Sequence, residues 1–161
     1  RSTSDVIKQL LAAKPVLFGE AEPPATPGVY LMTYAGEPCY VGMTKARCGL
    51  RDRLLRAHLH GDDGHVLHRE LGAAFPDKSL RVAHIKEAVS VQWAEADESK
   101  VAELESAVIN LIEPAWNRRR GSWRSLFGMT PRWLNHYYSA GCNGKPKWGS
   151  QAGGRPPEWV M

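Results

Sequence analysis

Alternating apolar and polar positions mark three short segments of the chain as candidate β-strands. Residues 29–34 and 39–42 form two apolar runs, and the residues between them include glycine and proline, as turns commonly do. This pattern predicts a β-hairpin. A similar alternation over residues 80–85 predicts a third strand.

Apolar residues at helical spacing predict several helices around these strands. We expect helices over residues 4–13, 50–59 and 64–74, and a longer one that begins at Asp97 and ends before Pro114. In the longer helix one apolar stripe is formed by Val101, Leu104, Val108, Leu111 and Ile112. The combination predicts an α+β fold with a small three-stranded antiparallel sheet flanked by helices.

Charge divides the chain unevenly. The net charge is +4, yet residues 118–161 carry eight Lys or Arg and a single Glu, together with most of the tryptophans. A basic surface with flat aromatic groups is typical of nucleic-acid contact, although a solvated tail whose tryptophans pack on the core is the alternative. We expect an N-terminal helix and linker over 1–25, a core over 26–117 and an irregular basic extension over 118–161, with a short helix at 131–139.

Composition excludes several classes of protein. No apolar run approaches the roughly 20 residues that a membrane span needs, and no signal-peptide pattern opens the chain. Three cysteines, Cys39, Cys48 and Cys142, lack paired-ligand spacing and favour reduced thiols in a cytoplasmic protein. Four histidines lie between residues 58 and 68, but no cysteine is close enough to complete a zinc site, so we expect exposed histidines without metal.

Two short motifs flank the turn of the predicted hairpin, Gly28-Val29-Tyr30 and Tyr40-Val41-Gly42. Arg53 follows on the next predicted helix, and the chain then continues with Glu105, Ile109, Pro114, Trp116 and Asn117. In this order and spacing, residues 26–117 resemble the GIY-YIG endonuclease family, with valine in place of the isoleucine of both motifs.

This resemblance implies a site that hydrolyses phosphodiester bonds. Tyr30 would act as general base or position the attacking water, and Tyr40 would support it through hydrogen bonds. Arg53 would clamp the phosphate with its planar set of donors. Glu105 would bind Mg²⁺ or Mn²⁺, which stabilises the leaving oxygen. Asn117 would tie down the backbone beside the site rather than take part in the chemistry.

A histidine departs from the family pattern. Members often carry histidine four residues after the arginine, whereas here that position is Ala57 and His58 follows Arg53 by five residues. Either Arg51 or Arg56 is the catalytic arginine, or His58 enters the site from a rotated direction.

Basic residues close to the motifs are candidate DNA contacts. They are Lys45, Arg47, Arg56, Arg118, Arg119, Arg120 and Arg124.

Taken together, the sequence predicts a metal-dependent DNA endonuclease, of a restriction-like type that cuts both strands and forms a homodimer. One alternative is a nucleic-acid-binding module that has lost cleavage. Within nucleases, the alternatives are a nonspecific or toxin nuclease and a repair nuclease.

Overall fold

The computed structural model describes residues 1–45, 47–62 and 64–117. The strands of this part are β1 (Val16–Leu17), β2 (Gly28–Tyr34), β3 (Glu37–Thr44) and β4 (Val89–Glu95). The helices are α1 (Thr3–Ala12), the 3-10 helix η1 (Phe18–Glu20), α2 (Gly49–Arg51), the π-helix η2 (Asp52–His58), α3 (Val66–Leu71), α4 (Lys78–Ala88) and α5 (Val101–Ile112). No helix within these ranges is long and apolar enough to cross a membrane.

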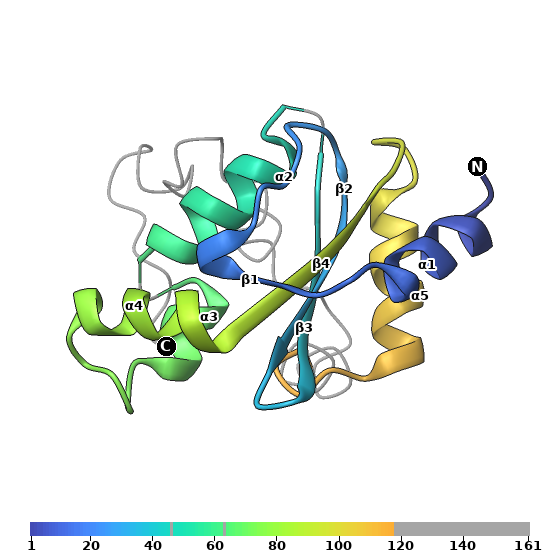
Figure 1. The fold of residues 1–161 in the computed structure, drawn as a ribbon. Helices are drawn as coiled ribbons and strands as arrows, with labels where there is room; N and C mark the ends of the chain where they lie inside the picture. Colours follow the sequence, from blue (N-terminus) through green and yellow to red (C-terminus); the bar gives the residue numbers. More distant parts are fainter. Residues whose placement is uncertain (46, 63, 118–161) are drawn as a thin grey trace, which may run out of the picture.

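All strands belong to one antiparallel sheet with the order β1-β4-β2-β3, and helices flank it (Figure 1). The predicted α+β class is therefore confirmed. The hairpin β2–β3 is confirmed as well, and it turns at Ala35 and Gly36, whose φ angles are 53° and 79°. Two successive positive φ angles are typical of the tight hairpin turn that matches strand twist, and the second falls on a glycine, which adopts it without strain.

The prediction of three strands was wrong in number, and its third strand was wrong in place. Residues 80–85 lie within α4, where Asp77 caps the helix by accepting a hydrogen bond from the Leu80 amide at 3.0 Å. Leu80 is 65% exposed, whereas Arg81 and Ile85, four residues apart, are buried, which is a helical repeat. The strand that completes the sheet is β4, and the two-residue β1 pairs with it.

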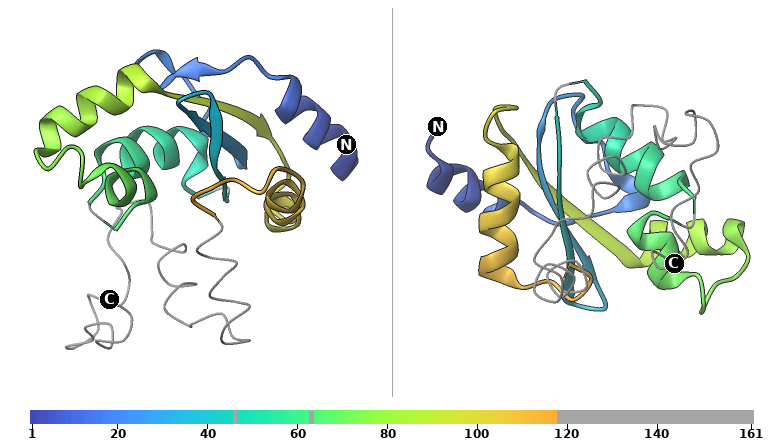
Figure 2. Two further views of the ribbon diagram at one scale, coloured as in Figure 1. Left: turned by 90° about the horizontal axis from the view of Figure 1, so that it is seen from below. Right: turned by 180° about the vertical axis from the view of Figure 1, so that it is seen from behind.

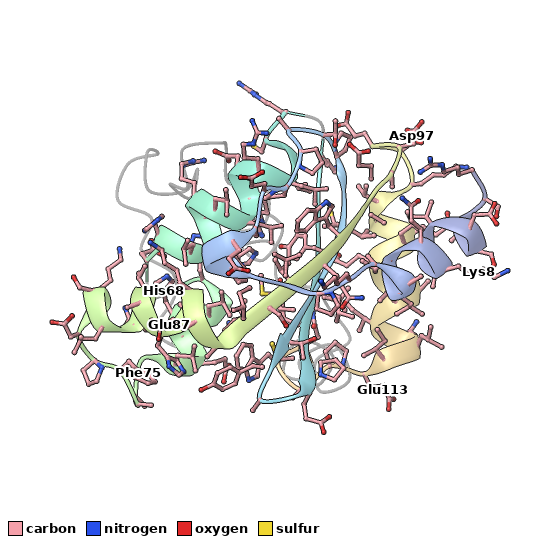
Figure 3. The ribbon with its side chains drawn as sticks, in the orientation of Figure 1. Lys8, His68, Phe75, Glu87, Asp97 and Glu113 are labelled. Atoms are coloured by element: carbon pink, nitrogen blue, oxygen red, sulfur yellow. The ribbon has the colours of Figure 1, made fainter. Side chains whose placement is uncertain are left out.

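The sheet separates two hydrophobic cores (Figure 2). Tyr30, Met32 and Tyr40 face the core that α2, η2, α3 and α4 cover, and Val29, Leu31 and Val41 face the core that α1 and α5 cover. Alternate residues of a strand point to opposite faces, so each motif contributes to both cores. Figure 3 shows His68 and Phe75 among the side chains on the α3–α4 side and Glu113 at the end of α5.

The N-terminal segment, predicted as a helix and linker, contributes α1, β1 and η1. Leu10 and Phe18 from this segment are buried in the two cores. The predicted extension over 118–161, including its helix at 131–139, lies outside the described residues.

The two cysteines within the described residues differ in state. Cys39 is a buried free thiol, and burial raises its pKa to about 12, so it serves as a small apolar residue. Cys48 is not a free thiol in the structure, which corrects the expectation of reduced cysteines at this position.

Candidate active site

The hydroxyl group of Tyr30 is the point at which three predicted site residues meet. Tyr30 is fully buried, its hydroxyl oxygen lies 2.6 Å from Nε2 of His58, and Nε of Arg53 donates to the same oxygen at 3.4 Å. Because a guanidinium only donates, the Tyr30 oxygen accepts from Arg53, and the imidazole tautomer decides whether Tyr30 or Nε2 of His58 donates in the other hydrogen bond. Strand β2 thus supplies a phenol to which helix η2 brings a cation and an imidazole.

Gly42 makes room for this phenol. Tyr30 pairs with Gly42 across the hairpin. A side chain at position 42 would collide with the Tyr30 hydroxyl, and its Cβ would lie 2.9 Å from ring carbon Cε2. The glycine of the second motif therefore lets the ring of the first motif lie across the neighbouring strand.

The π-helical winding of η2 explains the unusual spacing of Arg53 and His58. In an α-helix five residues make about 1.4 turns, which would place the two side chains about 140° apart. The Leu59 amide instead donates to the Leu54 carbonyl, the five-residue hydrogen bond of a π-helix. This wider turn brings both side chains to the Tyr30 hydroxyl.

The two alternative arginines are engaged elsewhere. Arg51 Nε donates to the Pro23 carbonyl at 3.1 Å, and Arg56 forms a two-pronged ion pair with Asp52 at 2.6 and 2.8 Å. Of the three arginines, Arg53 is therefore the one that joins Tyr30 and His58, and this contact supports the sequence-based choice.

Burial governs the chemistry of His58. Its side chain is 1% exposed, and burial, with a smaller contribution from Arg53, holds its pKa well below the ordinary value of 6.5. The imidazole is therefore neutral at neutral pH. A neutral imidazole that accepts at Nε2 can take up the phenol proton.

Tyr40 lies beside this group from the edge strand β3. Its ring centroid is 6.4 Å from that of Tyr30 and 5.8 Å from that of His58, and its side chain is 2% exposed. The hairpin thus brings the two motif tyrosines close together, as the sequence predicts.

Asn117 pairs with the open edge of β3 in the manner of another strand. Its Oδ1 accepts from the Val41 amide at 2.7 Å, and its Nδ2 donates to the Val41 carbonyl at 3.0 Å. The Trp116 amide also donates, at 2.9 Å, to the Cys39 carbonyl. These contacts fix the backbone on both sides of Tyr40.

Glu105 comes from the helix that covers the opposite face of the sheet. It is 8% exposed on α5, which contacts the edge strand β3 and the adjacent β2. The structure therefore unites Tyr30, Arg53 and His58 by direct contact, and it places Glu105 on an element packed against the strand of Tyr40. A buried carboxylate on this element offers the oxygen ligand that a hard divalent cation prefers.

The histidines between residues 58 and 68 are mostly buried, which corrects the expectation of exposed side chains. His58, His65 and His68 are 1%, 6% and 0% exposed. His68 bonds the Leu59 carbonyl through Nε2 at 3.0 Å and accepts from Arg81 through Nδ1 at 2.9 Å. Within the described ranges there is no group of three or more His, Cys, Asp or Glu side chains that could hold a metal ion.

The predicted DNA contacts are only partly visible. Lys45 and Arg47 are exposed just after β3, and Arg56 lies on the outer side of η2. Arg118, Arg119, Arg120 and Arg124 lie outside the described residues.

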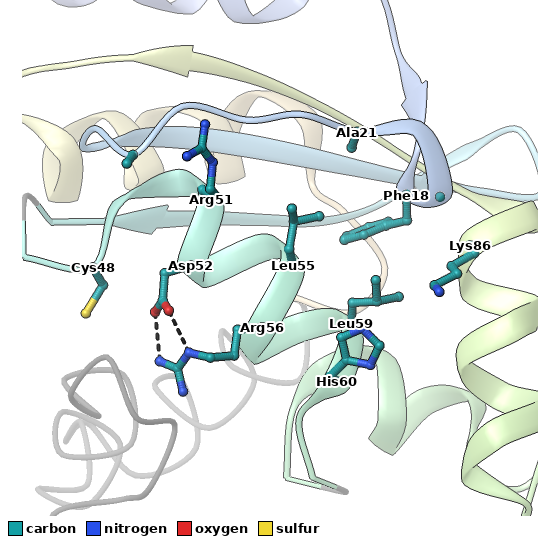
Figure 4. A pocket seen from close by; sticks show the side chains of 12 residues that line it. Phe18, Ala21, Cys48, Arg51, Asp52, Leu55, Arg56, Leu59, His60 and Lys86 are labelled. Atoms are coloured by element: carbon teal, nitrogen blue, oxygen red, sulfur yellow. Dashed lines mark hydrogen bonds and ion pairs between the residues drawn. The ribbon is translucent and has the colours of Figure 1, made fainter.

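A groove of about 510 Å³ runs along the outer side of η2 (Figure 4). Apolar side chains such as Phe18 and Leu55 line it together with Arg51, Arg56 and Lys86. The η2 residues that line this groove differ from those that contact Tyr30, so this groove lies apart from the candidate site.

Comparison with known proteins yields solved structures alone. No protein-family model matches the chain, and no curated protein matches its sequence. Two crystal structures of the GIY-YIG N-terminal endonuclease domain of UvrC from Thermotoga maritima are similar to it. Each is a point mutant bound to its catalytic divalent cation. Both are 22% identical, and the match covers 70% of this chain and 94% of that domain, with TM-scores of 0.37 and 0.34.

Proposed function

We propose that this chain is a divalent-metal-dependent DNA endonuclease of the GIY-YIG type. The observation that carries the proposal is the convergence of Arg53 and His58 on the buried hydroxyl of Tyr30. A phenol has an ordinary pKa near 10 and is a weak base at neutral pH, unless a neighbouring cation and a proton acceptor favour its ionised form. Both neighbours are present here.

Each residue of this group has a distinct task. Tyr30 receives a proton from the attacking water while its own proton passes to Nε2 of His58. Arg53 favours the phenolate and directs its remaining donors to the phosphate. Tyr40 packs beside the phenol and the imidazole, and Asn117 holds the strand that carries Tyr40.

Glu105 fits a divalent cation because it supplies one buried carboxylate, and Mg²⁺ and Mn²⁺ are the candidate ions. Mg²⁺ commonly binds through one or two carboxylates and substrate phosphate oxygens while it keeps several waters. When bound, such an ion stabilises the negative charge on the leaving oxygen.

The proposal is tested by incubating plasmid and single-stranded DNA with the protein and Mg²⁺ or Mn²⁺. Cutting that is lost in Glu105→Ala, while DNA affinity is retained, supports the nuclease. Glu103→Ala is the matched control, since Glu103 is an exposed carboxylate on the same helix. Binding without cutting by the parent on every substrate would instead indicate a nucleic-acid-binding module.

The finer proposal is a restriction-like homodimer that cuts both strands. A two-fold dimer would present one site to each strand. Sequenced product ends from a complex DNA digest test it, because a fixed sequence at both ends supports a restriction-like enzyme. Scattered ends would identify a nonspecific nuclease, and incision of one strand near lesions would identify a repair nuclease.

A further inference from the structure

His58 has a second ring nitrogen that the proposed chemistry has not yet used. In the tautomer whose Nε2 accepts the Tyr30 proton, which the proposed chemistry uses, the ring hydrogen of the neutral imidazole lies on Nδ1. Within the described part of the chain, Nδ1 is buried and has no hydrogen-bond partner. An unsatisfied buried donor costs about 1–3 kcal/mol, and such a group in a candidate site calls for an explanation.

The ring of His65 lies beside His58. The two ring centroids are 5.9 Å apart with their planes at 75°, and His65 is 6% exposed. Since Nδ1 of His58 has no direct hydrogen-bond partner among the described residues, a proton would cross between the two rings through one bridging water.

The backbone around His65 holds its ring in this place. The His65 amide donates to the Asp62 carbonyl at 3.0 Å, and the His65 carbonyl accepts from the Arg69 amide at 2.8 Å at the start of α3. A Cβ at Gly61 would lie 2.9 Å from Cγ of the His65 ring, so this glycine lets the ring lie against the end of η2. The ring therefore occupies a defined position rather than a loose surface one.

His65 also reaches toward solvent. Its Nε2 is 4.0 Å from Oδ1 of Asp62, whose side chain is 67% exposed. The side chains of Tyr30, His58, His65 and Asp62 thus lie one after another from the buried phenol to the surface, joined by one hydrogen bond, one ring contact and one separation of 4.0 Å.

We propose that His65 is a positioning residue that accepts the Nδ1 proton of His58 and passes it to solvent beside Asp62. This inference rests on the proposed nuclease function. The attacking water gives a proton to the Tyr30 oxygen, Tyr30 gives its own to Nε2 of His58, and His58 releases its Nδ1 proton to His65. The water oxygen forms the new bond to phosphorus, the bond to the leaving oxygen breaks, and that oxygen takes a proton from water.

Electrostatics keep both histidines from retaining the extra proton, so it has to continue to solvent. Burial, followed by Arg53, lowers the pKa of both histidines, to about 4 for His65. An imidazolium retained next to the Arg53 guanidinium would therefore be unstable. His68 does not serve as an alternative acceptor, since Leu59 and Arg81 occupy its two ring nitrogens.

The test compares single-turnover DNA cleavage by the parent, His65→Gln and the control His60→Gln, whose histidine is exposed. Glutamine can hydrogen-bond but does not relay a proton, so His65→Gln should cleave about 10–100-fold more slowly, a smaller loss than the roughly 100–10,000-fold typical of a direct general acid or base. The DNA affinity of His65→Gln should stay within about twofold of the parent, because the relay acts on the reaction and not on binding. The cleavage rate of His60→Gln should also stay within about twofold, because His60 takes no part in the proton transfer.

A second readout separates proton transfer from packing. In His65→Ala, added imidazoles should restore cleavage to a degree that increases with their basicity, whereas pyrrole, which has no basic nitrogen, should not. Equal rescue by pyrrole would overturn the relay and leave His65 a packing residue. Should both variants unfold, Asp62→Asn decides, because this exposed side chain lies where the relay reaches solvent: slower cleavage than the parent supports the relay, and an unchanged rate overturns it.

The outcomes for the two proposals differ. A parent that cuts, together with a His65→Gln variant that cuts equally fast, overturns the relay and keeps the nuclease. A parent that cuts no nucleic acid overturns both.

Discussion

Replacing Gly42 with alanine should show whether cleavage depends on the geometry around Tyr30 and not only on the stability of the fold. The new methyl group would collide with the hydroxyl and ring of Tyr30, which is fully buried. Tyr30 would have to move away from His58 and Arg53. Overpacking of a core typically costs about 1–3 kcal/mol, and a misplacement of about 1 Å in a catalytic group can cost about 100-fold in rate.

Gly36→Ala is the matched control in the same hairpin. No atom lies within 4 Å of a Cβ at this position, but its φ of 79° disfavours any side chain. The control should therefore lose about 1 kcal/mol of stability through backbone strain while leaving the site intact.

Urea denaturation measures the free energy of unfolding of both variants, and single-turnover DNA cleavage with Mg²⁺ measures their rates. We expect both variants to be destabilised and only Gly42→Ala to lose about 100-fold in cleavage. A Gly42→Ala protein that cleaves as fast as Gly36→Ala would refute the tight contact between Tyr30 and position 42.

Three further predictions follow from individual contacts. Asn117→Ala should lose about 1–3 kcal/mol of unfolding free energy in urea denaturation, since it leaves the Val41 backbone groups without their side-chain partner, whereas the exposed Asn110→Ala should change it little. Arg53→Lys should lose most cleavage activity because lysine lacks the planar donor set, and Arg51→Lys should not; equal loss in both would remove Arg53 from the site. Because the pKa of His65 is lowered to about 4, the unfolded chain binds more protons than the folded chain between pH 4 and 6.5. Stability should therefore fall by about 1.4 kcal/mol per unit as pH drops through this window, and urea denaturation at several pH values should show a shallower dependence in His65→Gln.

The sequence was sufficient for the hairpin and for the proximity of its two motif tyrosines. Turn residues between two apolar runs predict β2 and β3, and the motifs then bring Tyr30 and Tyr40 together, as the structure shows. The apolar stripe of α5 was equally clear, because Val101, Leu104 and Val108 repeat at helical spacing and are buried. Local pattern and tertiary packing agree in these elements.

Other elements depend on information that a local pattern does not contain. A short alternation over residues 80–85 is compatible with a strand, and only the Asp77 cap and the packing of Ile85 decide for α4. The two-residue β1 is too short to give a repeat and forms because β4 offers its edge. Both assignments come from tertiary contacts.

The π-helix is the feature of the site that sequence reasoning did not anticipate. The five-residue interval between Arg53 and His58 was the available signal, and it suggested a misassigned arginine as readily as a rotated approach of His58. His65 gave a weaker signal still, since an isolated histidine is ordinarily a surface residue. His65 is buried because Gly61, which has no side chain, leaves room for its ring. The spacing of apolar residues in the sequence gives no sign of this contact.

The most direct test of the central claim is the single-turnover DNA cleavage rate of Tyr30→Phe relative to the parent, with Mg²⁺ present. Phenylalanine keeps the buried ring and removes only the hydroxyl that contacts Arg53 and His58. We predict a loss of about 100-fold or more in cleavage with unchanged DNA affinity, in the range expected for removal of a general base. A Tyr30→Phe protein that cleaves DNA at the parent rate would contradict the assignment of this hydroxyl to the reaction.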